Sequence, residues 1–335
     1  MPRSEHENVP VLPAEFLGES APCLQDIFLI DISFPALPTL LLSTSDLRTL
    51  FLSNIPPGGY ISPEAMVVGL AALPMLEAIV IEFQTATPRP DRNHQPPGTR
   101  TVLPALTYFT FKGASEYLED LVARIDAPQL IALSVSYLNQ LDDFRVAQLR
   151  MFVDRTIGPK LASSRSARVE FYGNLVTFRI SPHAFDSHLD TPYAITSGLS
   201  QGMDWQVSHI AQVLNHFSAA LSNVVHLNLE LALAEDPQLE STDYVEWLHL
   251  FNQFPTVQTL HVSQRIAGHV ALVLEDISRD TGAQVLPILN LLYLAGQPAS
   301  SIDKFVAARR LYDRPVTVIE TEAEFVQKLK RYVGK

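Results

Sequence analysis

The chain has 335 residues and 47% of them are hydrophobic, which is enough to fill a sizeable core and excludes a chain that is disordered throughout. The 36 acidic and 24 basic residues give a formal net charge of -12, which argues against a nucleic-acid partner because phosphate binding needs a basic surface. A single cysteine, Cys23, and the lack of any run of about 20 apolar residues favour an intracellular protein, cytoplasmic or nuclear, with no membrane contact.

The first 18 residues are expected to form an N-terminal tail or the remnant of a preceding repeat. The segment "SAPCL" (20–24) that follows them resembles "DAPQL" (126–130), which leads into another strand-like run. We therefore expect the repeated part of the chain to extend from residue 19 to residue 313.

One short phrase recurs along the chain: an apolar residue, two others, a second apolar residue, one other, and a third apolar residue. Its last two apolar positions are separated by one residue, as in a short strand that is buried on one face. The copies begin at Leu24, Leu47, Leu76, Leu106, Leu130, Val224, Val257 and Leu289. Eight copies of one strand predict a repeat architecture.

Segments with helical spacing lie between these strands. They cover residues 62–73, 115–125, 142–156, 204–217, 242–254 and 269–280. Ser62 before Pro63, and also Ser115 and Asp204, stand where helix N-caps are expected. In each unit one strand face and one helix face are apolar, so the units must stack side by side to bury both.

This alternation predicts an α/β fold, an irregular leucine-rich-repeat solenoid with a horseshoe-like shape, parallel strands on the concave face and helices on the convex face. Copies within a run begin between 23 residues (24 to 47) and 33 residues (224 to 257) apart, close to the roughly 20–29 residues of a leucine-rich repeat. The Asn or Cys that usually follows the last Leu by three residues is absent, so each turn must satisfy its backbone groups in another way.

Three segments depart from the repeat. Residues 85–100 contain four prolines and three arginines and are expected to form a protruding loop insertion. An irregular insert at about 157–203 contains "RVEFYGNLVTFRIS" (168–181), which predicts a hairpin, and a further strand at 192–199. Residues 314–335 are expected to form a capping strand and a capping helix.

A family resemblance is carried by the phrases "LPAEFLGESAP", "GYISPEAMV", "TRTVLPALTYFTFKGASEYLEDLVARIDAPQL", "DWQVSHIAQV" and "KFVAARRL". Through them the chain resembles, from about residue 11 to residue 311, fungal F-box-type proteins with irregular leucine-rich repeats. The resemblance implies repeats that choose substrates for a cullin-type ubiquitin ligase, to which an N-terminal three-helix F-box docks. Here "LPAEFL" (12–17) is similar to an F-box opening, but only six residues separate Leu17 from Leu24. We therefore expect that the F-box is absent and that a ligase link needs one supplied elsewhere.

A serine hydrolase is the alternative from a different functional class, because "GLSQG" (198–202) matches the G-x-S-x-G nucleophile elbow. The candidate triad residues, in chain order, are Ser200, then Asp236 or Asp243, then His261 or His269. The expected helix starts at Asp204 rather than at the serine, and no Gly-rich oxyanion loop precedes it. An ordinary strand-to-helix turn is therefore the favoured interpretation.

Two polar loops are weaker candidates. A divalent cation could be collected by His183, Asp186, His188 and Asp190, but no second cluster completes its ligands, so a solvated loop is favoured. An acidic peptide could be bound by Arg89, Arg92, His94 and Arg100, although a solvent-facing loop is favoured there too. We expect no cofactor and no metal.

The residue between the last two apolar positions of each strand points away from the helices. This places Phe28, Phe51, Thr110, His261 and Tyr293 in one row, with Tyr108 beside it. Exposed aromatic side chains are typical of protein-binding hot spots, although neighbouring loops or a preceding repeat would explain Phe28 and Phe51 equally well. We therefore expect a non-enzymatic protein-protein interaction scaffold with its partner on the concave face, and a degenerate paralogue without a specific partner is a third alternative.

Overall fold

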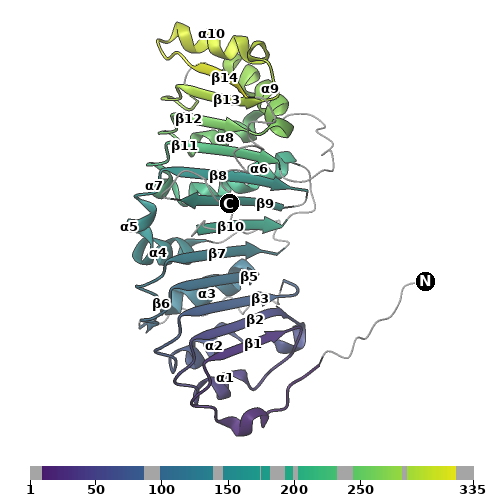
Figure 1. Cartoon of the computed structure of the whole chain (residues 1–335), viewed down its shortest axis with the longest axis vertical. Coiled ribbons are helices and arrows are strands. Elements are labelled where there is room, and N and C mark those ends of the chain that lie inside the picture. The colour runs from purple at the N-terminus through teal and green to yellow at the C-terminus, as the bar shows by residue number, and fades with distance from the viewer. Residues whose placement is uncertain are drawn as a thin grey trace, which may run out of the picture. The chain divides into compact units, whose positions relative to one another are not determined.

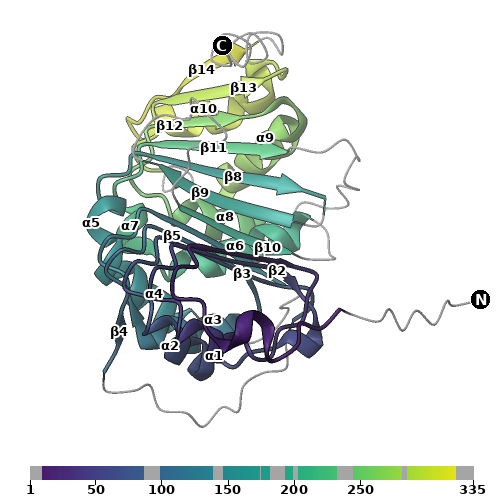
Figure 2. The same ribbon diagram turned by 60° about the horizontal axis from the view of Figure 1, so that its bottom comes forward.

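The computed structural model describes residues 10–86, 99–138, 146–173, 175–181, 193–198, 203–231, 244–280 and 285–321. It divides into a first unit, Met1–Ile157, and a second unit, Gly158–Lys335. Figures 1 and 2 show that both are built from strands and helices, and each unit is described by itself below. None of the helices in the described ranges is long and apolar enough to cross a membrane.

The first unit is a parallel sheet with helices on one side. Its strands, in spatial order, are β1 (Asp26–Ile30), β2 (Thr49–Ile55), β3 (Ala78–Phe83), β5 (Tyr108–Gly113) and β7 (Ala132–Tyr137). Two short strands, β4 (Thr101–Val102) and β6 (Ile125–Asp126), pair separately in parallel. Its helices are η1 (Phe16–Glu19), α1 (Leu37–Leu41), η2 (Pro57–Gly59), α2 (Pro63–Leu70), α3 (Ser115–Arg124) and α4 (Ala147–Thr156). Figure 2 shows α1 to α4 gathered on one side of these strands.

The second unit is also mostly parallel. Its strands, in spatial order, are β10 (Tyr193–Gly198), β9 (Leu175–Ser181), β8 (Ser166–Tyr172), β11 (His226–Leu231), β12 (Thr259–Val262), β13 (Leu291–Ala295) and β14 (Thr317–Thr321). Only β9 among these runs against its neighbours β8 and β10. Its helices are α5 (Gly158–Leu161), α6 (Met203–Asn215), α7 (Ser218–Leu221), α8 (Tyr244–Asn252), α9 (Gln264–Asp280), η3 (Ala299–Ile302) and α10 (Asp303–Leu311).

All eight copies of the repeated phrase form strands that pair in parallel with a neighbouring copy or strand, as predicted. The last two apolar positions of every copy are buried, except that Leu29 on the first strand is half-buried. The mixed α/β class with a mostly parallel sheet is therefore confirmed. The horseshoe-like curvature stays a prediction, and so do the boundaries at residues 18 and 313.

Main-chain hydrogen bonds join neighbouring repeats at the start of each strand. The carbonyl oxygen of Gln25 accepts hydrogen bonds from the amides of Arg48, at 2.7 Å, and Thr49, at 3.1 Å, in the next repeat. The same arrangement occurs at the carbonyls of Arg48, Glu77, Thr107, Arg165, Val225 and Gln258. We call these seven acceptors the carbonyl ladder. It satisfies the backbone at the start of each strand without a specific side chain.

Buried side chains connect neighbouring helices and turns. The Glu119 carboxylate on α3 accepts from the amides of Gln148, at 2.8 Å, and Leu149, at 2.7 Å, at the start of α4. At the end of the chain, the fully buried Arg309 guanidinium donates to five carbonyl oxygens. These belong to Val285, Leu286, Pro287, Leu289 and Arg314. Such contacts satisfy turn carbonyls and helix amides that would otherwise be buried without partners.

The irregular insert contains a ninth copy of the phrase. Ser164, Ala167 and Val169 occupy the three apolar positions, and β8 pairs in parallel with β11 in the register of the other copies. The predicted hairpin is also present, because β8 and β9 are antiparallel and Gly173 has a positive φ of 41° at the turn. Ser62 caps α2 through the amide of Ala65 at 3.2 Å, whereas α3 has Ala114 as its N-cap and Ser115 as its first residue, so the Ser115 cap was wrongly predicted.

Candidate interaction faces of the two sheets

The first unit has a sheet face that points away from the helices, and we call it the first outer face. In its middle row, Phe28, Phe51, Val80, Thr110 and Ser134 lie in register on β1, β2, β3, β5 and β7. All five side chains are partly or largely exposed, whereas the residues on either side of them are buried, apart from the half-buried Leu29. The sequence prediction for Phe28, Phe51 and Thr110 therefore placed them on the correct face.

Apolar side chains are exposed along the first outer face from β1 to β5. Phe28 is 61% exposed, Tyr108 57% and Ile30 54%, and the rings of Phe28 and Phe51 are in contact with centroids 5.4 Å apart. Val80 continues the row beyond Phe51. We call Phe28, Ile30, Phe51, Val80 and Tyr108 the aromatic patch. Contiguous exposed apolar side chains of this kind mark binding surfaces.

The charged residues around the aromatic patch are mainly acidic. Asp26 and Asp31 stand at the two ends of β1 and are both exposed. On β3, Glu82 accepts a hydrogen bond from Ser53 at 2.5 Å and lies in register with Lys112 on β5. A partner segment with basic side chains beside its apolar ones would therefore be electrostatically favoured.

The second unit has an equivalent face, which we call the second outer face. Here His261 and Tyr293 lie in register on β12 and β13, and their rings stack with centroids 4.2 Å apart and planes 3° apart. The pKa of His261 is lowered, mainly because neighbouring residues reduce the solvation of its imidazole and to a smaller extent because of the nearby His226. The His261 side chain nevertheless remains exposed on the sheet. His261 and Tyr293 are thus brought together, as predicted. They belong to a different unit from Phe28, Phe51, Tyr108 and Thr110.

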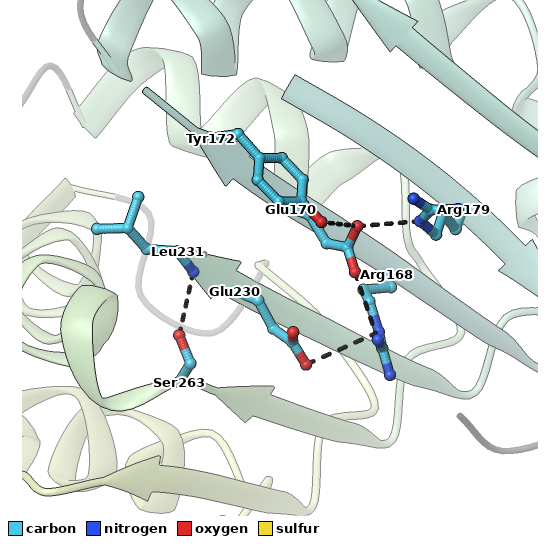
Figure 3. Close-up of polar contacts among 7 residues, drawn as sticks. All are labelled: Arg168, Glu170, Tyr172, Arg179, Glu230, Leu231 and Ser263. Carbon is cyan, nitrogen blue, oxygen red and sulfur yellow. Dashed lines mark hydrogen bonds and ion pairs between the residues drawn. The ribbon is translucent and has the colours of Figure 1, made fainter. Parts of the chain in front are cut away.

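A network of charged residues occupies the second outer face where β9, β8 and β11 meet (Figure 3). The Glu170 carboxylate accepts hydrogen bonds from the Tyr172 hydroxyl at 2.7 Å, from Arg179 Nε at 2.9 Å and from Arg168 Nη1 at 3.3 Å. Arg168 also forms an ion pair with Glu230 on β11, with 3.8 Å between Nε and Oε1. We call these five residues the charged network.

The charged network has a buried centre, Arg168 and Glu170, half-buried outer members, and equal numbers of arginines and glutamates. Only 5% of Arg168 and 1% of Glu170 is exposed, even though both side chains point away from the helices. Burial alone would raise the pKa of Glu170, but the Tyr172 hydroxyl and the two guanidinium groups outweigh it and lower that pKa. Burial and the Glu170 carboxylate raise the pKa of Tyr172 to about 12. The Glu170 carboxylate therefore stays ionised at neutral pH, and its contacts tie three strands together.

The chemistry of a serine hydrolase finds no support in the described residues. Ser200, Asp236 and Asp243 lie outside them, while His261 is on the second outer face and His269 is buried on α9 beside Trp247, with ring centroids 5.6 Å apart. A different serine, Ser197, shares a hydrogen bond of 2.9 Å with Nε2 of His209. Ser197 is fully buried and burial lowers the pKa of His209 to about 4, so this pair joins β10 to α6 without access to a substrate.

The two polar loops considered from the sequence lie mainly outside the described residues. This holds for Arg89, Arg92 and His94, and for the four candidate cation ligands at 183, 186, 188 and 190. Arg100 is described, and its Nε donates to the carbonyl oxygen of Ala123 at 3.3 Å. Over the residues that the structure describes, no three His, Cys, Asp or Glu side chains are grouped so that they could hold a metal ion.

Comparison with known proteins adds little to this picture. No protein-family model matches the chain. No curated protein matches it either. Among solved structures, the leucine-rich repeat-containing protein LegL7 from Legionella pneumophila is similar, with 13% identity, coverage of 87% of this chain and 70% of that one, and a TM-score of 0.32. A TM-score this low carries no argument, so the leucine-rich-repeat interpretation continues to rest on the repeated strands and turns of the chain itself.

Proposed function

We propose that this chain is a non-enzymatic protein-interaction module of the leucine-rich-repeat type, which binds a partner protein through the aromatic patch of its first unit. The observation that carries the proposal is the exposure of Phe28 and Ile30 on β1, with Phe51 in ring contact with Phe28, on a face that the helices leave open. Transfer of one such side chain from water into an interface stabilises a complex by about 1.5–3 kcal/mol. Several adjacent ones form the usual core of a binding hot spot.

The second outer face is a weaker candidate for contact with the same partner or another one. The stacked His261 and Tyr293 rings offer a flat aromatic surface, but the charged network beside them is held by its own hydrogen bonds and ion pairs. A partner would have to compete with those hydrogen bonds to bind there. We therefore assign the main contact to the aromatic patch. We also propose that this face is the concave side of a horseshoe-like repeat and that the partner protein binds on that side.

The role as a substrate-recognition part of a cullin-type ubiquitin ligase is a finer form of this proposal. It is supported by the resemblance to F-box-type repeat proteins and by no contact in the structure. It requires an F-box supplied by another chain or by another part of the gene product. The partner experiment below therefore includes the ligase adaptor as a separate readout.

The test compares two double variants that add the same negative charge at different places. Phe28→Glu with Phe51→Glu disrupts the aromatic patch, whereas Leu42→Glu with Val68→Glu alters apolar side chains on the helix side that are similarly exposed, 56% and 58%. Each purified chain is used to capture proteins from an extract of the native cells, and captured proteins are identified by mass spectrometry.

The proposal expects at least one protein that is retained by the wild type and by the helix-side variant and is lost with the patch variant. Recovery of the cullin adaptor with that protein would support the ligase role. Identical protein sets for all three chains, with folds verified by circular dichroism, would contradict binding through the aromatic patch.

A further inference from the structure

The aromatic patch lies directly beside an open strand edge. In the described part of the first unit, β1 is the terminal strand and pairs along one edge with β2. The carbonyl of Gln25 and the amide of Asp31 both bond toward β2 or its flanking residues. Because hydrogen-bonding direction alternates along a strand, Asp26, Phe28 and Ile30 direct their amides and carbonyls toward the opposite edge.

The chain already pairs one short segment at this end of the sheet. Immediately beyond β1, Val11 and Ser33 form a parallel bridge. The amide of Leu12 donates to the carbonyl of Ser33 at 2.9 Å, and the amide of Ser33 donates to the carbonyl of Pro10 at 3.0 Å. Backbone pairing past β1 is therefore compatible with the surrounding packing, and an added strand along β1 would continue it.

The same residues offer both backbone and side-chain contacts. Phe28 and Ile30 carry exposed apolar side chains on the first outer face while their backbone groups point to the open edge. Asp26 is exposed at one end of that edge, whereas the Asp31 carboxylate at the other end accepts a hydrogen bond from Asn54 on β2. The negative charge at Asp26 disfavours self-association of two copies of a chain that also has a net charge of -12, and it favours a basic partner.

We propose that the partner of this chain docks as an added β-strand: an extended segment with alternating apolar side chains and flanking Lys or Arg residues, which pairs with the open edge of β1. The inference rests on the proposed function, because it specifies how a protein partner uses the aromatic patch. In this mode backbone hydrogen bonds supply affinity, and every second side chain of the segment reaches Phe28, Ile30 and Phe51. A basic residue of the segment lies against Asp26.

Two substitutions at one position separate the backbone from the side chain. Ile30→Pro removes the amide hydrogen that faces the open edge, which an edge strand tolerates because that group does not bond to β2. Ile30→Thr removes apolar surface from the same residue but keeps the amide. The two variants and the wild type are first compared by thermal unfolding to verify that each is folded.

The binding experiment uses random 12-residue peptides displayed on phage, selected on the wild-type chain and then synthesised with a fluorescent label for anisotropy titration. We expect selected sequences to alternate apolar residues between Lys or Arg. We expect Ile30→Pro to weaken their binding about tenfold or more, as the loss of one or two backbone hydrogen bonds would, and Ile30→Thr to weaken it less. Methylation of alternate peptide amides should reproduce the loss.

The outcomes distinguish this inference from the proposed function. Peptides that lose affinity with Phe28→Glu and Phe51→Glu but bind Ile30→Pro as well as Ile30→Thr would overturn strand addition while leaving the aromatic patch as a binding surface. Selection that yields no peptide dependent on Phe28 and Phe51 would overturn both. Selected peptides rich in Asp and Glu would contradict the charge part of the inference.

Discussion

The outer faces of the two units are made from the same repeated strand and carry different chemistry. On the first, Phe28, Phe51 and Val80 stand in register and are open to solvent. On the second, Arg168 occupies the corresponding position of β8, is buried, and forms ion pairs with Glu170 and Glu230. The outward-facing positions of the strands can therefore either bind a partner or stabilise the fold. Exposed side chains indicate the first role, and buried side chains indicate the second.

The largest expected effect comes from breaking the charged network. Glu170→Gln would leave Arg168 and Arg179 without their shared counter-charge, and removal of one member of a buried ion pair costs about 3–5 kcal/mol. The free energy of unfolding in urea measures the loss. The matched control is Glu77→Gln in the first unit, which breaks the exposed Arg48–Glu77 pair at 2.7 Å and should cost less than about 1 kcal/mol. Equal losses would contradict the structural role of the charged network.

Acid should weaken the second unit in two steps. Because burial lowers the folded-state pKa of His209 to about 4 from an ordinary 6.5, the unfolded chain binds a proton more readily, and stability falls as the pH drops from about 6.5 to about 4. The loss is on the order of 3 kcal/mol. Glu170, whose folded-state pKa is lowered, adds a further loss at lower pH, below the pKa of an unfolded glutamate. Desolvation also lowers the pKa of His261 and of His269, so these imidazoles add to the loss over the same pH range. Urea unfolding of wild type and His209→Gln between pH 7 and pH 4 measures the first step, which should be smaller in the variant by the share of His209.

The aromatic patch should affect binding and leave stability nearly unchanged. For a purified partner, Phe28→Ser with Phe51→Ser should weaken affinity about 100-fold, equivalent to about 2.7 kcal/mol, because two hot-spot side chains are lost. Its free energy of unfolding should change by less than about 1 kcal/mol, as is usual for surface positions. Calorimetric titration and urea unfolding check the two parts. A large loss of stability with intact binding would show that these side chains serve the fold, as the charged network does.

The smallest expected effect compares two tyrosines on the outer faces. Tyr172→Phe removes one donor from the buried Glu170 carboxylate and should cost about 1 kcal/mol. Tyr108→Phe removes an exposed hydroxyl from the aromatic patch and should leave stability unchanged within error. Thermal unfolding under identical conditions measures both, and a cost for Tyr108→Phe as large as that for Tyr172→Phe would remove the distinction between the faces.

The sequence was sufficient to locate the eight regular strands, because the alternation of buried and exposed positions is a local property. It missed the ninth copy on β8, where Ser164 and Ala167 replace larger apolar residues and still pack fully buried. Charged residues alternate with apolar ones in "ARVEFY" (167–172), which could have indicated polar side chains on the outer face. Their partners Arg179 and Glu230 come from other strands, and that pairing depends on a register that the sequence does not reveal.

The same reason explains the errors in detail. Ser115 has the residue type of an N-cap, but α3 begins at Ser115, one residue earlier than that prediction required, and its N-cap is Ala114. The Glu119 carboxylate accepts hydrogen bonds from the first amides of α4, a contact between helices that the sequence did not indicate. The role of Arg309 could not be predicted from the sequence either. Four of its five carbonyl acceptors lie in a turn that is more than 19 residues away in the chain. Contacts between repeats need the three-dimensional stacking before they can be assigned.

The carbonyl ladder has a consequence for how such a chain can change over time. Its acceptors belong to Gln25, Arg48, Glu77, Thr107, Arg165, Val225 and Gln258, which share no side-chain chemistry. Since any residue has a carbonyl, substitutions at these positions leave these hydrogen bonds between repeats intact. Related chains can therefore diverge until the repeat motif is no longer recognisable in their sequences while the fold is kept. Residues on the outer faces can change at the same time and bind new partners.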